Sequence, residues 1–113
     1  PAARIASYLQ RGNNGYGLRF YARYNASTLY KAMEITANYE VLPGSNGTVD
    51  LGNASNRWKN VYTSDLDLSN EAKGGNDVDG TWGSYTIQEG ESDLFLINKR
   101  NGKKYKFNLT EVS

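Results

Sequence analysis

The sequence predicts an all-β protein of short antiparallel strands, arranged as a meander followed by a C-terminal β-hairpin. Apolar and polar residues alternate with a period of two in several segments, as half-buried strands require. Clusters of Gly and Asn, which tolerate the backbone conformations of turns, separate these segments. The three-and-four spacing of apolar residues that marks an amphipathic helix is hard to find anywhere in the chain.

The meander is predicted over three N-terminal strands. Alternation runs over residues 4–9, 18–24 and 32–42, and turn-forming residues occupy 11–15 and 25–28. The third strand is the clearest, because one parity holds only apolar or aromatic side chains: Met33, Ile35, Ala37, Tyr39 and Val41. A half-buried antiparallel strand has this pattern.

Beyond a break at 43–47, the sequence predicts a short strand at 48–51 and a loop ending on Trp58 and Tyr62. Residues 65–68 alternate again, and the polar, Gly-rich stretch 71–80 is typical of a linker. The predicted organisation is therefore a meander with this loop motif over 1–70, a linker over 71–80, and a hairpin module over 81–113.

The C-terminal hairpin is predicted from Asn101-Gly102, which favours a two-residue type I′ turn. This turn would place Leu96 opposite Phe107 and Leu94 opposite Leu109, with Phe95 and Ile97 on the other face. A lone hairpin is marginal in water, and apolar side chains on both faces imply a cover for each. A neighbouring subunit is the simplest cover.

The composition also points to partner chains. Only 38% of the 113 residues are hydrophobic, so a monomer has a thin core. Cys is absent, which excludes stabilisation by disulfides and leaves oligomerisation or a metal. A sequence that opens on Pro1 is expected to be a fragment or a processed product.

The distribution of charge argues against binding to nucleic acid, and the lack of a long apolar run argues against insertion into a membrane. The net charge is only +1, and the basic residues gather at the two ends of the chain, so no uniform basic field exists. No apolar run is long enough to span a bilayer.

The residue types argue against an enzyme and predict no cofactor. His and Cys are both absent, which removes the commonest general base, the thiolate nucleophile and most transition-metal ligands. A glycan-depolymerising activity would have to use carboxylates such as Glu89, Glu91 and Asp93, whose spacing is also that of a solvated turn.

Two pairs of closely spaced acidic residues are alternatives for binding a hard cation such as calcium. Asp65 and Asp67 would share one face of a strand, and Asp77 and Asp79 lie in a turn. A complete calcium-loop pattern is missing, so no metal site is assigned, and solvated carboxylates are the favoured interpretation.

The tip of the hairpin is the candidate contact for a receptor or an anion. Its residues are Lys99, Arg100, Lys103, Lys104 and Tyr105, with Lys106 beside them. The positive charges would hold an anionic glycan and Tyr105 would stack on it. The favoured alternative is a soluble turn whose lysines protect a strand edge, since no second aromatic residue interleaves with them.

Two stretches resemble a known class of protein. Gly17–Tyr21, Ala32–Ile35, Val41–Gly44 and the motif Leu51-Gly52…Arg57-Trp58-Lys59-Asn60-Val61-Tyr62 resemble the C-terminal regions of bacteriophage tail fibres, especially those of marine and cyanobacterial phages. The stretch from Tyr85 through Asn101-Gly102 to Phe107 is similar to a module that ends such proteins.

The resemblance implies a homotrimer of interwoven strands at the distal end of a virion fibre. The exposed end of such a fibre contacts a glycan or protein receptor on the host surface. Trp58, Tyr62, Phe95 and Phe107 are the expected structural anchors, with Trp58 buried. Alternatives are a purely structural trimerisation or capping module, a depolymerase tip and a bacterial surface adhesin. After Tyr62 the chain lacks the basic segment that opens a self-cleaving chaperone domain, so autoproteolysis is not implied.

Overall fold

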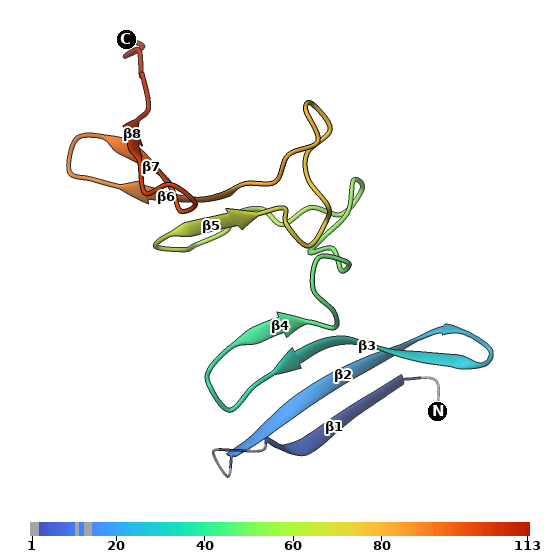
Figure 1. Ribbon diagram of the computed structural model, residues 1–113. Helices are drawn as coiled ribbons and strands as arrows, with labels where there is room; N and C mark the ends of the chain where they lie inside the picture. Colours follow the sequence, from blue (N-terminus) through green and yellow to red (C-terminus); the bar gives the residue numbers. More distant parts are fainter. Residues whose placement is uncertain (1–2, 11, 13–14) are drawn as a thin grey trace. The chain divides into compact units, whose positions relative to one another are not determined.

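The computed structural model describes residues 3–10, 12 and 15–113, and over this part of the chain it contains strands and no helix. The predicted all-β fold is confirmed: the chain forms two four-stranded antiparallel sheets, in the orders β1-β2-β3-β4 and β5-β6-β7-β8 (Figure 1). Two units, Pro1–Leu51 and Gly52–Ser113, each contain one sheet. No helix in the described residues is long and apolar enough to cross a membrane.

The first sheet is a meander, and its turn at 25–28 follows the sequence pattern. Its strands are β1 (Ala3–Gln10), β2 (Gly15–Asn25), β3 (Thr28–Ile35) and β4 (Val41–Pro43). The predicted turn at 25–28 is confirmed, because Asn25 pairs with Thr28 and the Asn25 side-chain oxygen accepts a hydrogen bond from the Ser27 amide at 3.0 Å. Residues 11, 13 and 14 of the other predicted turn lie outside the described residues.

The single strand predicted over 32–42 is wrong. β3 ends at Ile35, the chain reverses over 36–40, and β4 returns antiparallel to β3. The turn is held by Thr36, whose amide donates to the Glu40 carbonyl at 2.9 Å and whose hydroxyl donates to the Glu40 carboxylate at 2.9 Å. Tyr39 has a φ of 65°, a left-handed conformation that favours Gly or Asn. The sequence pattern did not reveal this reversal, because the alternation continues through it and no glycine interrupts it.

The first sheet is amphipathic. Cross-strand pairing places Ile5 beside Phe20 and Phe20 beside Met33, while Leu18 pairs with Ile35 and Ile35 with Val41. One face therefore carries a continuous set of apolar and aromatic side chains: Ile5, Leu9, Tyr16, Leu18, Phe20, Met33, Ile35 and Val41. We call this set the apolar face of the first sheet. The opposite face carries Arg4, Tyr8, Arg19, Tyr21, Lys31 and Glu34.

The second sheet begins well after the predicted strand at 48–51, which is not formed. Its strands are β5 (Leu66–Ser69), β6 (Ser84–Glu89), β7 (Leu94–Asn98) and β8 (Lys104–Lys106). Residues 71–80, predicted as a linker, lie within the second unit and connect β5 to β6, which pair with each other.

The hairpin forms where it was predicted, but its turn and register differ. Leu96 pairs with Tyr105, and the Asn98 amide donates to the Lys103 carbonyl at 2.8 Å, so the loop contains four residues instead of two. Among the described residues of this loop, only Gly102 has positive φ, at 75°, whereas a type I′ turn needs two such residues. The register has slipped by two positions. An even slip keeps every side chain on its predicted face.

The second sheet is amphipathic as well. One face carries apolar and aromatic side chains from all four strands: Leu66, Leu68, Tyr85, Ile87, Leu94, Leu96, Tyr105 and Phe107. We call this set the apolar face of the second sheet. Phe95 and Ile97 lie on the opposite face, as the sequence predicted, and the changed register places them beside Lys106 and Lys104.

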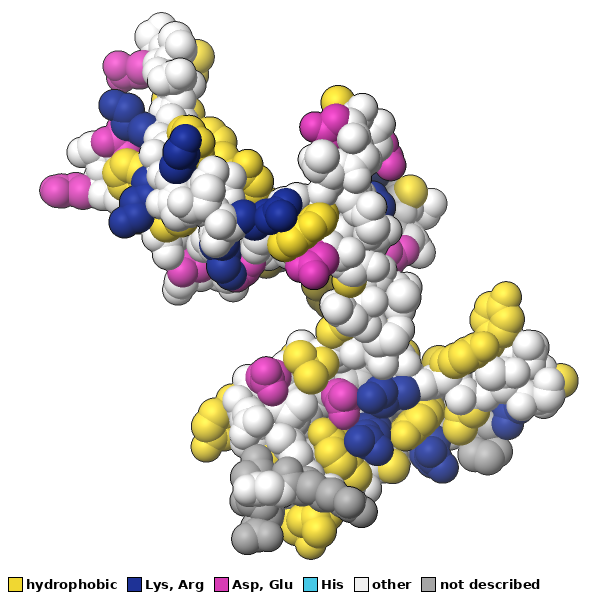
Figure 2. Space-filling view, in the orientation of Figure 1, with side chains coloured by type: hydrophobic (Ala, Val, Ile, Leu, Met, Phe, Trp, Pro, Cys, Tyr) yellow, Lys and Arg dark blue, Asp and Glu magenta, His cyan; other side chains and the backbone are white. Residues whose placement is uncertain are grey.

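Neither sheet has its apolar face covered within its own unit. None of the described hydrophobic side chains is buried, and Figure 2 shows such side chains on the surface of both units. The chain has an accessible surface of 9682 Å². Each unit therefore leaves exposed part of the apolar surface that a folded protein normally buries.

Lys106, at the end of β8, and Phe107, which follows it, test whether the apolar face of the second sheet is covered in solution. Phe107→Ser removes an aromatic ring from the apolar face, and we expect it to lower the free energy of unfolding by about 1.5–3 kcal/mol. Lys106→Ser, on the opposite face, should change it by less than about 0.5 kcal/mol. Urea denaturation followed by tryptophan fluorescence measures both. Equal effects of the two substitutions would contradict the assignment of the faces.

Candidate functional site

The predicted receptor contacts lie around the β7–β8 loop, where the structure gives Lys99 and Arg100 different partners. The Lys99 ammonium lies 2.7 Å from the Asp67 carboxylate of β5. Both side chains are exposed to solvent, so this ion pair contributes little to stability, but it neutralises one of the charges of the tip.

Arg100 packs on an aromatic residue that the sequence did not connect with the tip. Its guanidinium carbon lies 3.7 Å from the centroid of the Trp82 ring, and Nη1 donates to the Trp82 carbonyl at 3.0 Å. The expectation that no second aromatic residue accompanies the charges is therefore wrong. Trp82 lies just before β6, eighteen residues from Arg100, and only the pairing of β6 with β7 brings them together.

Two of the other predicted contacts, Lys104 and Tyr105, do not share one surface. Lys103 and Lys104 make no ion pair with any described residue. Tyr105 is 47% exposed and belongs to the apolar face, whereas Lys104 points to the opposite face of the same strand. Tyr105 therefore cannot stack on a ligand that Lys104 binds.

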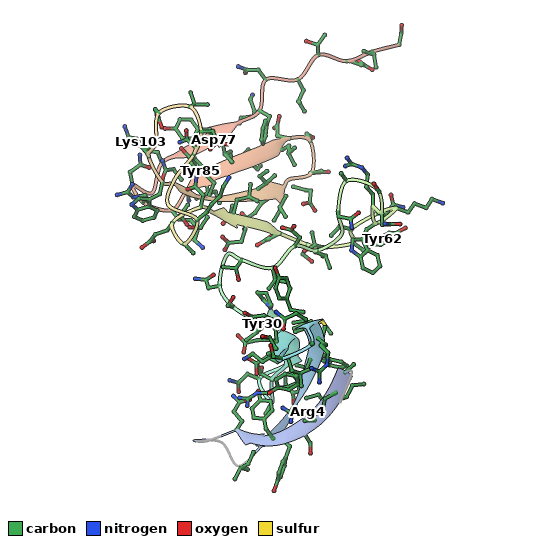
Figure 3. All side chains as sticks on the ribbon, turned by 90° about the vertical axis from the view of Figure 1, so that its right-hand side faces the viewer. Arg4, Tyr30, Tyr62, Asp77, Tyr85 and Lys103 are labelled. Atoms are coloured by element: carbon green, nitrogen blue, oxygen red, sulfur yellow. The ribbon has the colours of Figure 1, made fainter. Side chains whose placement is uncertain are left out.

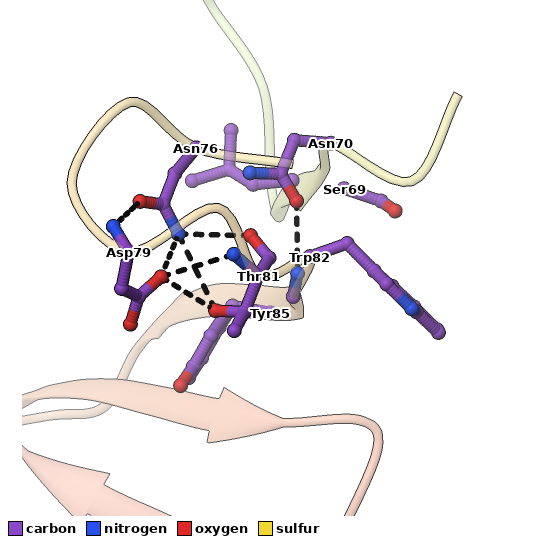
Figure 4. A pocket seen from close by; sticks show the side chains of 9 residues that line it. Ser69, Asn70, Asn76, Asp79, Thr81, Trp82 and Tyr85 are labelled. Atoms are coloured by element: carbon purple, nitrogen blue, oxygen red, sulfur yellow. Dashed lines mark hydrogen bonds between the residues drawn. The ribbon is translucent and has the colours of Figure 1, made fainter. Parts of the chain in front are cut away.

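A hollow surface does surround Trp82. On one side, Asn70, Asn76, Asp79 and Thr81 line a depression of about 520 Å³ with Trp82 and Tyr85 (Figure 4). On the other side, Asn98, Arg100 and Asn101 line a depression of about 380 Å³ with the same two aromatic residues. We call the two adjoining depressions the Trp82 groove. Its size is in the range of small-molecule sites, and it is lined mainly by aromatic and amide side chains.

The loop on one side of the groove is held by the side chain of Asn76. Its Oδ1 accepts from the amides of Val78 and Asp79 at 2.7 and 2.9 Å. Its Nδ2 donates to Asp79 Oδ1 and to the Thr81 carbonyl, both at 2.8 Å (Figure 4). Gly75, which precedes Asn76, has a φ of 111° and no space for a Cβ, because the Gly80 carbonyl closes the loop against it.

Hydrogen bonds also fix the charge of Asp79. The Thr81 hydroxyl and amide donate to its Oδ1 at 2.8 and 3.0 Å, and with Asn76 they lower the pKa of this carboxyl below its ordinary value. A depressed pKa in the folded state means that the stabilisation is present above the ordinary pKa and is lost as the pH falls through the folded value. Asp79 is therefore a carboxylate at neutral pH.

Two further hydrogen bonds position the groove on the second sheet. Asn70 Oδ1 accepts from the Gly83 amide at 2.8 Å, which ties the end of β5 to the start of β6. Asn98 of β7 donates to the Tyr85 hydroxyl of β6 at 3.2 Å. The groove thus depends on residues from three strands that no local sequence motif joins.

The polar face of the first sheet holds a separate cluster of charged and aromatic residues. Glu34 lies 3.0 Å from Lys31 and 3.3 Å from Arg19, whose guanidinium packs over the Tyr8 ring at 3.8 Å. Hydrogen bonding by Lys31, followed by Tyr8 and Arg19, lowers the pKa of Glu34. Every charge in this cluster has a partner, so we interpret it as stabilising the sheet.

Two of the predicted structural anchors are not anchored in the single chain. Trp58 is 64% exposed and Tyr62 is 92% exposed, and Tyr62 projects from a segment without strands (Figure 3). Trp58 is therefore not buried in the single chain, and its burial in an assembly stays a prediction. Its motif forms a turn around Asn53, whose side chain accepts from the amides of Ser55 and Asn56, and this turn supplies no strand that could cover the indole.

The other two anchors lie in the final hairpin. Phe95 is 36% exposed, and Phe107 is partly covered and donates its amide to the Leu94 carbonyl at 2.9 Å. They lie on opposite faces of the sheet.

The remaining acidic candidates are dispersed. Asp65 accepts from the Gln88 side chain at 2.9 Å, and Asp67 pairs with Lys99. Within the described ranges, no three acidic side chains come together in a group able to hold a metal ion. Glu89 and Glu91 are exposed near the β6–β7 turn, away from the residues that line the Trp82 groove.

Comparisons with known proteins add no relative: no family model matches the chain, and searches of curated proteins and of solved structures return no significant match.

Proposed function

We propose that this chain is a subunit of an obligate homotrimer and forms a structural and adhesive module at the distal end of a bacteriophage tail fibre. The observation that carries the proposal is that both sheets leave an apolar face uncovered. In a water-soluble protein such faces are covered by other elements or by other chains. Within its own unit, neither sheet has a second layer among the described residues, and copies of the same chain would supply one.

The size of the uncovered surface supports an obligate assembly. Two separate compact units, each of half the mass of this chain, would together expose about 7,500 Å². The accessible surface of 9682 Å² exceeds this value by about 2,200 Å². Obligate oligomers bury roughly 2,000–5,000 Å², and their interfaces resemble a domain core cut in half. The excess is of the size that such an interface removes.

Trimeric symmetry and the attachment role rest on the resemblance of the Leu51–Tyr62 motif and of the final hairpin to tail-fibre ends. A cyclic arrangement of three chains would bring three copies of each sheet face together around one axis. It would also present three copies of any binding surface. Weak contacts at each copy then add up to firm attachment through avidity.

The oligomeric state is the direct test of this proposal. Size-exclusion chromatography with multi-angle light scattering should give about three times the chain mass of 12.6 kDa at micromolar concentration. Circular dichroism of the same fractions establishes that they contain folded β-structure. A folded monomer would contradict the proposal, and a folded dimer would contradict the trimer and with it the fibre assignment.

A further inference from the structure

We propose that the Trp82 groove binds an acidic saccharide, with the acidic group of the sugar held by Arg100 and its hydroxyl groups held by Asn70 and Asp79. The proposal rests on the attachment role proposed above and names the class of ligand. It replaces the hairpin tip as the candidate contact, because the tip residues do not share one surface.

The aromatic side chains give the groove an apolar platform. Trp82 and Tyr85 line both depressions, and both are partly exposed. A pyranose ring has C–H groups on its faces that pack on an aromatic ring, while its hydroxyl groups at the rim keep polar partners. A groove with aromatic residues at its centre and polar groups around them suits such a ligand.

Hydrogen-bonding groups remain available at one end of the groove. Asn70 uses only its Oδ1, so its NH₂ group donates to no described residue. Asp79 accepts from Asn76 and Thr81 through Oδ1, and its side chain is exposed, so the carboxylate can accept a further hydrogen bond. A sugar hydroxyl both donates and accepts, so it can accept from Asn70 and donate to Asp79.

The other end of the groove selects a negative charge. Stacking on Trp82 orients the Arg100 guanidinium, and one of its five N–H groups is used on the Trp82 carbonyl. The remaining N–H groups can bind a carboxylate, sulfate or phosphate through two parallel hydrogen bonds. The Asp79 carboxylate repels an anion at the opposite end, so the ligand binds in one orientation.

The groove is organised before a ligand arrives. The Asn76 side chain joins residues 76, 78, 79 and 81 by hydrogen bonds, and Asn98 fixes the Tyr85 hydroxyl. A site with fixed side chains loses less conformational entropy on binding.

A printed array of neutral, uronate-, sulfate- and phosphate-bearing glycans, probed with the assembled full chain, tests this inference. We expect binding to acidic glycans only. Arg100→Gln should weaken binding to those glycans at least about tenfold, which corresponds to about 1.4 kcal/mol. Trp82→Ala should abolish it. Lys73→Gln removes one positive charge from an exposed residue outside the groove, and it should bind like the unchanged chain.

Light scattering on each sample separates the two proposals. Three results would overturn the groove proposal and leave the assembly role intact. These are trimers that bind no acidic glycan, trimers that prefer neutral glycans, and Arg100→Gln trimers that bind as well as the unchanged ones. A folded monomer of the unchanged chain overturns the assembly role, whatever it binds. Arg100→Gln changes an exposed side chain and preserves the fold, so it tests the groove even if Trp82→Ala fails to fold.

Discussion

Replacing Ile5 by Asp is expected to abolish assembly of the chain. Ile5 is 69% exposed in the single chain, where the substitution would cost almost nothing. It belongs to the apolar face of the first sheet, where it pairs with Phe20. If that face packs against another chain, each subunit buries an unpaired carboxylate at a cost of about 3–5 kcal/mol. Sedimentation velocity should then show loss of the trimer.

Val112→Asp is the matched control for this experiment. It introduces the same charge at an exposed apolar residue that lies outside both sheets, and it should leave the trimer intact. If Ile5→Asp assembles as well as Val112→Asp, the apolar face of the first sheet is not an interface. The proposed origin of the assembly would then fail for that sheet.

Gly44→Ala should destabilise the first unit by about 2–3 kcal/mol, in the range of substitutions that force overpacking. The Gly44 amide donates to the Ala32 carbonyl at 2.8 Å, which holds the segment after β4 against β3. A Cβ at this position would overlap the backbone carbonyl of Lys31. A carbonyl inside a paired strand cannot rotate away, so the hydrogen bond to Ala32 has to break.

Gly83→Ala adds the same methyl group where it would meet only the edge of the Tyr85 ring, at 3.1 Å. This side chain can shift, so the loss of stability should be smaller. Urea denaturation compares the two variants. An unchanged midpoint for Gly44→Ala would show that the chain after Pro43 does not pack against β3 in solution.

The alternation of residue types predicted the all-β fold and the faces on which the side chains of the predicted strands lie, but it missed β6 and the reversal between β3 and β4. Side chains in a strand point to opposite faces with a period of exactly two residues, so parity assigns them without knowledge of the partner strand. Phe95 and Phe107 were assigned to opposite faces for this reason, and the assignment survived the changed loop because the register slipped by an even number.

Turn signals in the sequence failed at two reversals of the chain. The reversal at 36–40 contains no glycine, and a tyrosine takes the left-handed position because Thr36 and Glu40 close the turn around it. The Asn101-Gly102 pair favoured a two-residue turn, but pairing of β7 with β8 places a four-residue loop there. Turn preferences are worth little compared with the pairing of whole strands.

The sequence by itself determined that the protein is all-β, that its strands are amphipathic, and that its apolar content gives a monomer only a thin core. These properties depend on composition and on a period of two, which are local. Only the tertiary structure decided which residues form the candidate site. Asn70, Asp79 and Trp82 come from the connection between β5 and β6, and Arg100 comes from the loop between β7 and β8. They meet because backbone hydrogen bonds between β5, β6 and β7 align the ends of these strands.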